Sequence, residues 1–293
     1  MLQILKDKRK GFVYSIIFGA FLALFLLIAV YYTQTVAEND LSVEYAENIE
    51  KRSCLYDDLV TDVMDMMEFR ARVDHGPSAT YVIFEDKLPS KPKINMTQAF
   101  DDWEFYIDEV YEGKVNENIT LNTTYYRSVP RAYIDPFECY YKYDDIKKTE
   151  AVFYGEDANI RNYTIDAVVE AKLTSVKDKD WDWSDDPTNL YVVINIQDFT
   201  GSAVFVDGRT EGYVEPDENN EAELKFAGNK RVYINAGGYP GHGESAFRIS
   251  STAAATHFNL TAGLVGDEPT SVWLPIGVNI QGNEDSYAVV ASG

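Results

Sequence analysis

The chain of 293 residues is poor in the residue types from which metal sites and disulfide frameworks are built. It has two cysteines and three histidines, and the histidines stand far apart in the sequence. Because zinc sites draw their ligands mainly from these two residue types, we expect no zinc site. The sequence also has neither a phosphate-binding loop nor a dinucleotide fingerprint. These absences favour a binding or structural protein over an enzyme.

Positive charge is scarce as well, since 26 Lys and Arg residues face 48 Asp and Glu residues, for a net charge of −22. A chain this acidic repels the phosphates of nucleic acids, so we expect no nucleic-acid partner. The acidity is typical of a solvated, highly charged surface on an extracellular or salt-adapted protein.

The two cysteines, Cys54 and Cys139, are the only candidates for a disulfide. Outside the cell such a pair is more often bridged than free. A bridge that closes a loop of this length stabilises a fold by about 4–5 kcal/mol on the chain-entropy model. We therefore predict a Cys54–Cys139 disulfide, and two buried, inert thiols are the alternative.

Long uncharged runs are absent except at the start, where residues 12–32 carry no charge. A helix of about 21 residues spans roughly 32 Å, close to the hydrocarbon thickness of a bilayer. The run is longer than the apolar core of a secretory signal, which has about 7–15 residues. Basic residues precede it, so residues 1–11 are expected in the cytoplasm and the rest outside. This pattern predicts a transmembrane helix over residues 12–37 and a single-pass protein of the cell membrane with an extracellular C-terminal domain.

After this run, apolar residues recur at a spacing of three or four through residues 41–67, with acidic residues on the opposite face. His75, Gly76 and Pro77 form a stop signal. We expect an amphipathic helical stalk over residues 38–75, continuous with the preceding segment or joined to it near residues 37–41. Its apolar stripe must rest on its own globular domain or on a neighbouring copy.

The remaining residues divide by their periodicity. Residues 76–162 are rich in turn residues and tyrosine, and they suggest an irregular, glycan-bearing region with one helix near residues 97–112. From residue 163 short β-rich runs alternate with Gly, Pro, Asn and Asp, which predicts an antiparallel β-sandwich over residues 163–293. The predicted fold class is α+β, with a long N-terminal transmembrane and stalk helix followed by a mostly antiparallel β-sandwich ectodomain.

Five Asn-x-Thr sequons suggest that this ectodomain carries glycans. Unmodified asparagines in turns are the alternative interpretation. The acceptor residues are Asn95, Asn118, Asn122, Asn162 and Asn259.

Two segments carry residues that are typical of catalytic or metal sites. The run "GGYPGHGESAF" places Ser245 in a partial nucleophile elbow, but Phe247 stands where the elbow requires glycine, so we expect no catalysis. The run "DKDWDWSDD" places Asp178, Asp180 and Asp182 at alternate positions, which suits the oxygen ligands of Ca²⁺. An EF-hand is excluded by the residues that follow, so a looser calcium site or a solvated acidic turn remains.

The basic stretch, Gly11 and the apolar run that begins at Phe12 resemble the leader of archaeal type IV pilin-like proteins. The resemblance implies cleavage between Gly11 and Phe12, retention of the apolar helix and its packing against copies of itself in a filament core, with β domains facing outward. The expected function is a pilin-like filament or adhesion subunit without catalysis. The alternative is a single-pass anchored ectodomain that binds a carbohydrate or protein ligand without forming filaments.

Overall fold

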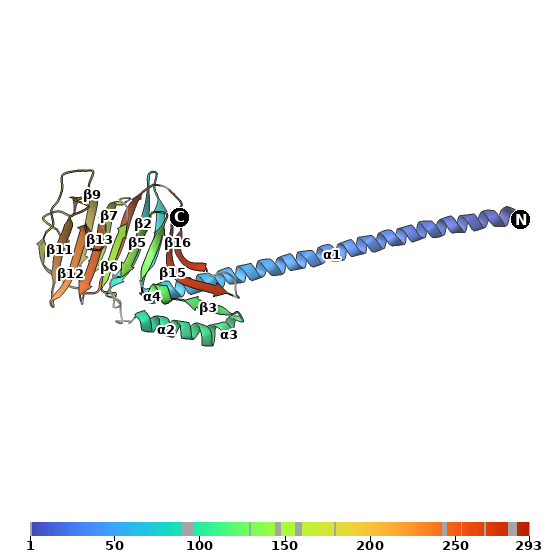
Figure 1. The fold of residues 1–293 in the computed structure, drawn as a ribbon, viewed down its shortest axis with the longest axis horizontal. Coiled ribbons are helices and arrows are strands. Elements are labelled where there is room, and N and C mark those ends of the chain that lie inside the picture. The colour runs from blue at the N-terminus through green and yellow to red at the C-terminus, as the bar shows by residue number, and fades with distance from the viewer. Residues whose placement is uncertain are drawn as a thin grey trace. The chain divides into compact units, whose positions relative to one another are not determined.

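The computed structural model describes the backbone of most of the chain (Figure 1). Side chains are described in the same ranges, except those of residues 2–23, 36–45, 96, 178 and 286–292. The chain divides into two compact units, residues 1–57 and residues 58–293. The described ranges are residues 2–89, 96–128, 130–143, 148–155, 160–178, 180–241, 245–252, 254–266, 268–280 and 286–292.

Helix α1 (Leu2–Met67) supplies nearly all of the first unit and enters the second. No proline interrupts it. The helix ends eight residues before the expected stop at His75, because Glu68 adopts a left-handed conformation with φ of 51°. The amide of Phe69 then donates to the carbonyl of Met64 at 3.1 Å, which satisfies one of the free carbonyls of the last turn. Residues 70–75, expected as the end of the stalk, form strand β1 (Arg70–His75) instead.

The prediction of a transmembrane helix over residues 12–37, and with it the single-pass placement in a cell membrane, is wrong. In the part of the chain that the structure describes, no helix combines the length and the apolar content that a membrane span requires. A span needs about 20 consecutive apolar residues.

Within its described residues, the second unit is built mainly from two β-sheets, one of six strands and one of ten. The first sheet has six strands, in the order β1, β2 (Ala79–Leu88), β14 (Thr256–Val265), β7 (Ile160–Val169), β9 (Leu190–Asp198) and β10 (Glu211–Val214). The second sheet has ten, in the order β16 (Ser286–Ser292), β15 (Ser271–Ile280), β4 (Arg131–Asp135), β5 (Cys139–Tyr143), β6 (Glu150–Gly155), β13 (Ala246–Thr252), β12 (Lys230–Gly237), β11 (Asn219–Phe226) and β8 (Leu173–Asp178), with β3 (Ile119–Asn122) also paired to β15. Strands β7 and β9 pair in parallel, and the other described pairs are antiparallel.

The core lies between these two sheets, because alternate side chains of their strands point inward. In β9, Leu190, Val192, Ile194 and Ile196 are buried, and less buried residues separate them. Aromatic contacts cross from sheet to sheet, as between Tyr163 of β7 and Phe247 of β13, whose ring centroids are 5.2 Å apart.

The predicted fold class is therefore corrected to a mostly β fold in which strands dominate the second unit. Strands from residues 76–162, expected as irregular, take interior places in both sheets. Strand β2 pairs with β14, and β5 lies between β4 and β6. Tyr141 and Tyr143 are buried in β5, so these two tyrosines of the region expected to be irregular belong to the core.

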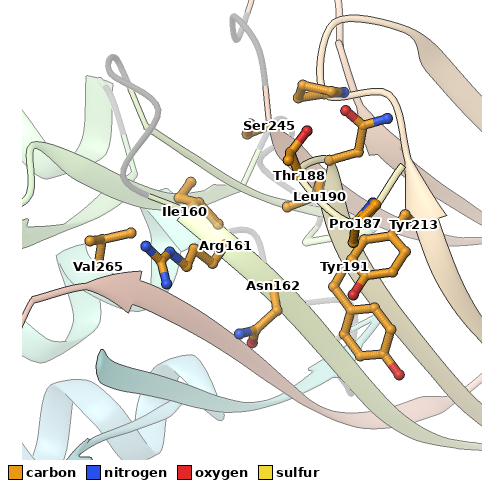
Figure 2. Close-up of a pocket in the computed structure, with 12 residues that line it drawn as sticks. Ile160, Arg161, Asn162, Pro187, Thr188, Leu190, Tyr191, Tyr213, Ser245 and Val265 are labelled. Atoms are coloured by element: carbon orange, nitrogen blue, oxygen red, sulfur yellow. The ribbon is translucent and has the colours of Figure 1, made fainter. Parts of the chain in front are cut away.

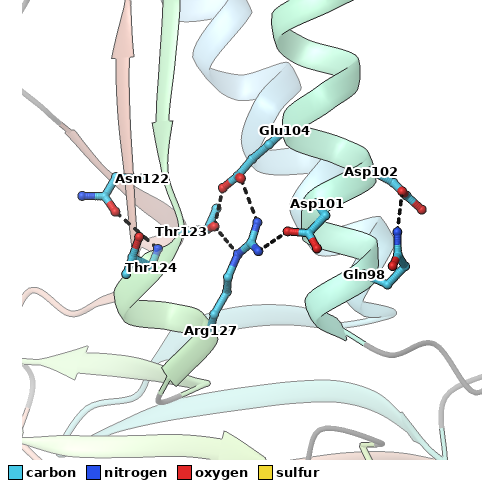
Figure 3. A network of polar contacts seen from close by, with 8 residues as sticks. All are labelled: Gln98, Asp101, Asp102, Glu104, Asn122, Thr123, Thr124 and Arg127. Atoms are coloured by element: carbon cyan, nitrogen blue, oxygen red, sulfur yellow. Dashed lines mark hydrogen bonds and ion pairs between the residues drawn. The ribbon is translucent and has the colours of Figure 1, made fainter.

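A helical segment joins β2 to β3. It consists of α2 (Met96–Tyr106), the π-helical turn η1 (Ile107–Tyr111) and α3 (Glu112–Val115), and α4 (Thr124–Ser128) follows β3. Figure 3 shows Arg127 of α4 between Asp101 and Glu104 of α2. The Arg127 Nε–H also donates to the Thr123 hydroxyl at 2.7 Å, so one guanidinium connects the two helices.

Candidate functional site

The most exposed apolar surface in the described residues lies on helix α1, over residues 24–32, which we call the apolar segment. Its large side chains are 52–72% exposed, and they occupy consecutive positions, so they surround the helix rather than form one stripe. A helix that is apolar all round is normally buried. The exposed residues are Leu24, Phe25, Leu26, Leu27, Ile28, Val30, Tyr31 and Tyr32.

The threonines that follow the apolar segment satisfy their hydroxyl groups within the helix. The Thr33 hydroxyl donates to the carbonyls of Ala29 at 3.0 Å and Val30 at 2.9 Å. The Thr35 hydroxyl donates to the carbonyl of Tyr31 at 2.9 Å. Because these bonds need no external partner, a neighbouring helix can pack here without leaving a buried hydroxyl unpaired.

A cavity of about 680 Å³ lies in the second unit, beside the ends of β7, β9 and β10 (Figure 2). Tyr191 and Tyr213 line it from neighbouring strands, with ring centroids 5.1 Å apart. Arg161 and Asn162 of β7 also line it. Burial, followed by the hydrogen bond that its hydroxyl donates to Glu211 at 2.9 Å, raises the pKa of Tyr191. The wall therefore combines neutral ring faces, an amide and a guanidinium, groups that bind polar ligands with flat apolar faces.

The partial nucleophile elbow does not present its serine in the way a hydrolase requires. Gly243 and Glu244 lie outside the described residues. Ser245 is 4% exposed with φ of 59°, and both its amide and its carbonyl form hydrogen bonds. Its amide donates to the Pro216 carbonyl at 2.8 Å, and its carbonyl accepts the Tyr163 hydroxyl at 2.7 Å. Ser245 thus holds a turn, and His257, the downstream histidine, lines other cavities.

The three aspartates considered for calcium lie at the end of β8 and just after it. The side chain of Asp178 is outside the described set, and Asp180 and Asp182 are exposed. The backbone amide of Asp182 donates to the Asn220 side-chain oxygen at 3.1 Å. Among the residues that the structure describes, no group of three His, Cys, Asp or Glu side chains has the geometry of a metal site. The calcium site stays a prediction.

The predicted sites of modification are only partly described. Asn95 lies outside the described residues. At Gly11 and Phe12 only the backbone is described, and it is helical. Asn162 is half-buried at the cavity. Glycosylation and leader cleavage stay predictions. The three sequon residues that are exposed to solvent are Asn118, Asn122 and Asn259.

The predicted Cys54–Cys139 disulfide is wrong, because both thiols are free. Cys139 points into the core from β5, and its thiol donates to the Phe137 carbonyl at 3.4 Å. Burial, followed by the charge of Glu138, raises the pKa of Cys139 to about 12. Cys54 lies exposed on α1. The alternation of β5 places Cys139 at an inward position, where it packs as an apolar residue.

Sequence reasoning missed a pair of buried charges, Asp86 and Lys148. Asp86 occupies an inward position of β2, in phase with the buried residues Val82, Phe84 and Leu88. An aspartate at an inward strand position indicates a buried ion pair, because a buried carboxylate needs a charged or hydrogen-bonding partner. Lys148 follows β5 in the chain and gave no such signal.

Comparison with known proteins adds no relative: no family model matches the chain, and neither curated proteins nor solved structures give a significant match. The function must therefore be inferred from the exposed helix and from the β unit themselves.

Proposed function

We propose that the chain is a noncatalytic, pilin-like subunit that assembles with copies of itself through the apolar segment of α1. The observation that carries this proposal is the exposure of eight large apolar side chains on all sides of one helix. In such a filament the helices form the core, and the β units are displayed outside it. Cleavage between Gly11 and Phe12, which the leader resemblance implies, would precede assembly.

The energetics support association. Full burial of one large apolar side chain contributes about 1.5–3 kcal/mol. Eight such side chains, each more than half exposed, can offset the roughly 4–15 kcal/mol that association costs in lost freedom of motion. A helix that is apolar all round suits a core in which each helix has several neighbours, whereas a two-helix pair would leave part of its surface in water.

The charge of the chain suits the display of the β units. The net charge of −22 makes copies repel one another unless an apolar surface holds them together. Assembly through α1 leaves the acidic surfaces in solvent. We therefore expect filaments to become more stable as salt screens this repulsion.

The test compares the full chain with two variants of α1 by negative-stain electron microscopy and sedimentation. Leu27→Glu places a charge at a position that is 68% exposed in the apolar segment. Gln34→Glu, the matched control, places the same charge at an exposed position just beyond it. We expect filaments from the wild type and the control and none from Leu27→Glu. Filaments that persist in Leu27→Glu, or a wild type that stays monomeric, would overturn the proposal.

A second candidate function is the binding of a carbohydrate in the cavity beside Tyr191 and Tyr213. Sugar rings pack their apolar faces on aromatic side chains and pair their hydroxyls with amide and charged groups. Calorimetric titration with defined oligosaccharides tests it, with Tyr213→Ala as the variant expected to lose binding and exposed Phe205→Ala as the control. Equal affinities of both variants and the wild type would exclude this site.

A further inference from the structure

A lysine and an aspartate meet in the core between the two sheets. Asp86 belongs to β2 in the first sheet, and Lys148 stands between β5 and β6 of the second. The Lys148 Nζ and the Asp86 Oδ1 are 2.6 Å apart. Their side chains are 1% and 0% exposed. Neither charged group contacts water. Burying the two charges therefore costs desolvation free energy, which only their mutual attraction and their hydrogen bonds offset.

Both oxygens of Asp86 are fully engaged. Oδ1 accepts the Lys87 amide at 2.6 Å in addition to the Lys148 ammonium. Oδ2 accepts two phenol hydroxyls, from Tyr141 at 2.5 Å and from Tyr143 at 2.7 Å. The two oxygens therefore differ, since one faces the amine and the other is held by a pair of neutral donors.

The amine is equally well held. Lys148 Nζ also donates to the carbonyls of Met67 and Glu68, at the end of α1. Its position over the ring of Tyr143, 5.1 Å from the centroid, adds a further contact. These contacts restrict the rotamers of the Lys148 side chain and hold its amine beside the Asp86 carboxyl group.

We propose that Lys148 and Asp86 condense to form an isopeptide bond between Nζ and Cγ. No activating group is needed beyond the site itself, because the enclosure disfavours the charged pair and the product carries no charge. The ammonium and the carboxylate become one neutral amide, and one water molecule is released.

The condensation balances within the cluster. A proton passes from the ammonium to Oδ1, which leaves a neutral amine beside a neutral carboxylic acid. The Nζ lone pair then attacks Cγ, and the negative charge develops on Oδ2, where the hydroxyls of Tyr141 and Tyr143 stabilise it. A second proton moves from Nζ to the Oδ1 hydroxyl, the Cγ–Oδ1 bond breaks and water leaves. The remaining N–H of the amide keeps its acceptor at Met67.

The two tyrosines are suited to this task because they remain protonated. Burial, followed by the charge of Asp86, raises the pKa of both phenols well above the ordinary value. They therefore act as donors at any physiological pH and do not compete with Lys148 as bases.

The bond would connect the two sheets through the core. It closes a loop between β2 and the start of β6. A covalent loop of this kind lowers the conformational entropy of the unfolded chain and so stabilises the folded state. A subunit under tension along its chain would then resist separation of the sheets. The cross-link does not depend on assembly, since it forms within one chain, and either proposal can fail while the other holds.

The decisive measurement is the intact mass of the denatured, purified full chain. We expect a mass lower than that of the sequence by one water molecule. Proteolysis should yield one branched peptide that contains both Asp86 and Lys148. A mass equal to that of the sequence would overturn the proposal and leave an ordinary buried ion pair.

Two matched variants test whether the loss of one water molecule from the mass arises at Asp86 and Lys148. Lys148→Arg removes the nucleophilic amine and keeps the charge, so its mass should show no loss of water. Lys87→Arg makes the same change at the neighbour of Asp86 and should retain the loss, because the side chain of Lys87 is only half-buried and takes no part. A deficit that persists in Lys148→Arg, or disappears in Lys87→Arg, would show that another pair of residues reacts and would overturn the assignment.

Discussion

The rings of Phe84 and Tyr141 are stacked, with centroids 4.3 Å apart and planes 9° from parallel. Phe84 belongs to β2 in the first sheet and Tyr141 to β5 in the second. Phe69, just beyond the end of α1, stacks on both rings, with centroid distances of 5.6 Å. One aromatic cluster therefore holds together both sheets and the chain segment that leaves the helix.

The first prediction follows from this cluster. Phe84→Ala should lower the free energy of unfolding by about 3–5 kcal/mol, because it removes a fully buried ring and leaves a cavity. Urea denaturation measures the change. The control is Phe205→Ala, which truncates a ring that is 55% exposed and should change the free energy by less than about 0.5 kcal/mol. Equal losses in the two variants would contradict the core position of Phe84.

The strands that begin at residue 160 were largely readable from the sequence, but those before it were not. Strand β14 alternates buried Phe258, Leu260 and Ala262 with more exposed residues, so its period of two is visible locally. Strand β5 has the sequence "CYYKY", where inward and outward tyrosines look alike. Only its pairing with β4 and β6, which is not local, decides which tyrosines are buried.

Non-local strand pairing also decides where helix α1 ends and which residues line the cavity, so neither could be predicted from the sequence. Residues 70–75 contain no glycine or proline that would end a helix, but the pairing of Val73 with Val82 makes them a strand. The apolar segment of α1 could be read directly, since it is continuous in sequence. The cavity could not, because Asn162, Tyr191 and Tyr213 come together only through the neighbouring strands β7, β9 and β10.

The second prediction concerns the two free thiols. In the native protein, one thiol should react rapidly with a disulfide reagent such as DTNB, and this should be Cys54, which is exposed. Cys139 should react only after denaturation, because it is buried and its pKa of about 12 leaves almost no thiolate at neutral pH. Cys54→Ser should abolish the native reaction, and Cys139→Ser should leave it unchanged. Two equivalents of native reaction would contradict the buried position of Cys139.

The third prediction is a pH dependence that originates at Asp198, the last residue of β9. Its carboxylate accepts the Thr200 hydroxyl at 2.6 Å and the Leu173 amide at 2.9 Å, among other donors. These bonds lower the pKa of Asp198 below its usual 3.8. Because the folded pKa lies below the unfolded one, the stabilisation is fully present above about pH 4 and is lost as the pH falls through the folded pKa.

Asp198→Asn should therefore be less stable than the wild type at neutral pH, and this difference should shrink as the pH falls from about 5 to about 2. Urea denaturation at a series of pH values measures it. Asp185→Asn, a change of the same type at an exposed position, is the control and should track the wild type at each pH. A difference for Asp198→Asn that stays constant with pH would show that the loss is steric rather than electrostatic.

The fourth prediction concerns Arg127, whose guanidinium connects α4 to α2 (Figure 3). Its Nη2 lies 2.8 Å from the Glu104 carboxylate, its Nη1 pairs with Asp101, and its side chain is only 20% exposed. Hydrogen bonds to charged groups contribute about 1.5–3 kcal/mol. Arg127→Met, which keeps the aliphatic bulk, should lower the free energy of unfolding by about that amount.

The control for Arg127 is a second arginine in a solvated ion pair. Arg72 lies 2.9 Å from Asp74, but the two side chains are 68% and 50% exposed. Arg72→Met should cost only about 0–1 kcal/mol, since water and salt screen the pair. Raising the salt concentration should reduce the small effect at Arg72 and leave most of the effect at Arg127, because the Arg127 side chain is only 20% exposed whereas that of Arg72 is 68% exposed. If both variants lose the same stability and respond equally to salt, Arg127 is a surface residue in solution and does not hold α2 in place.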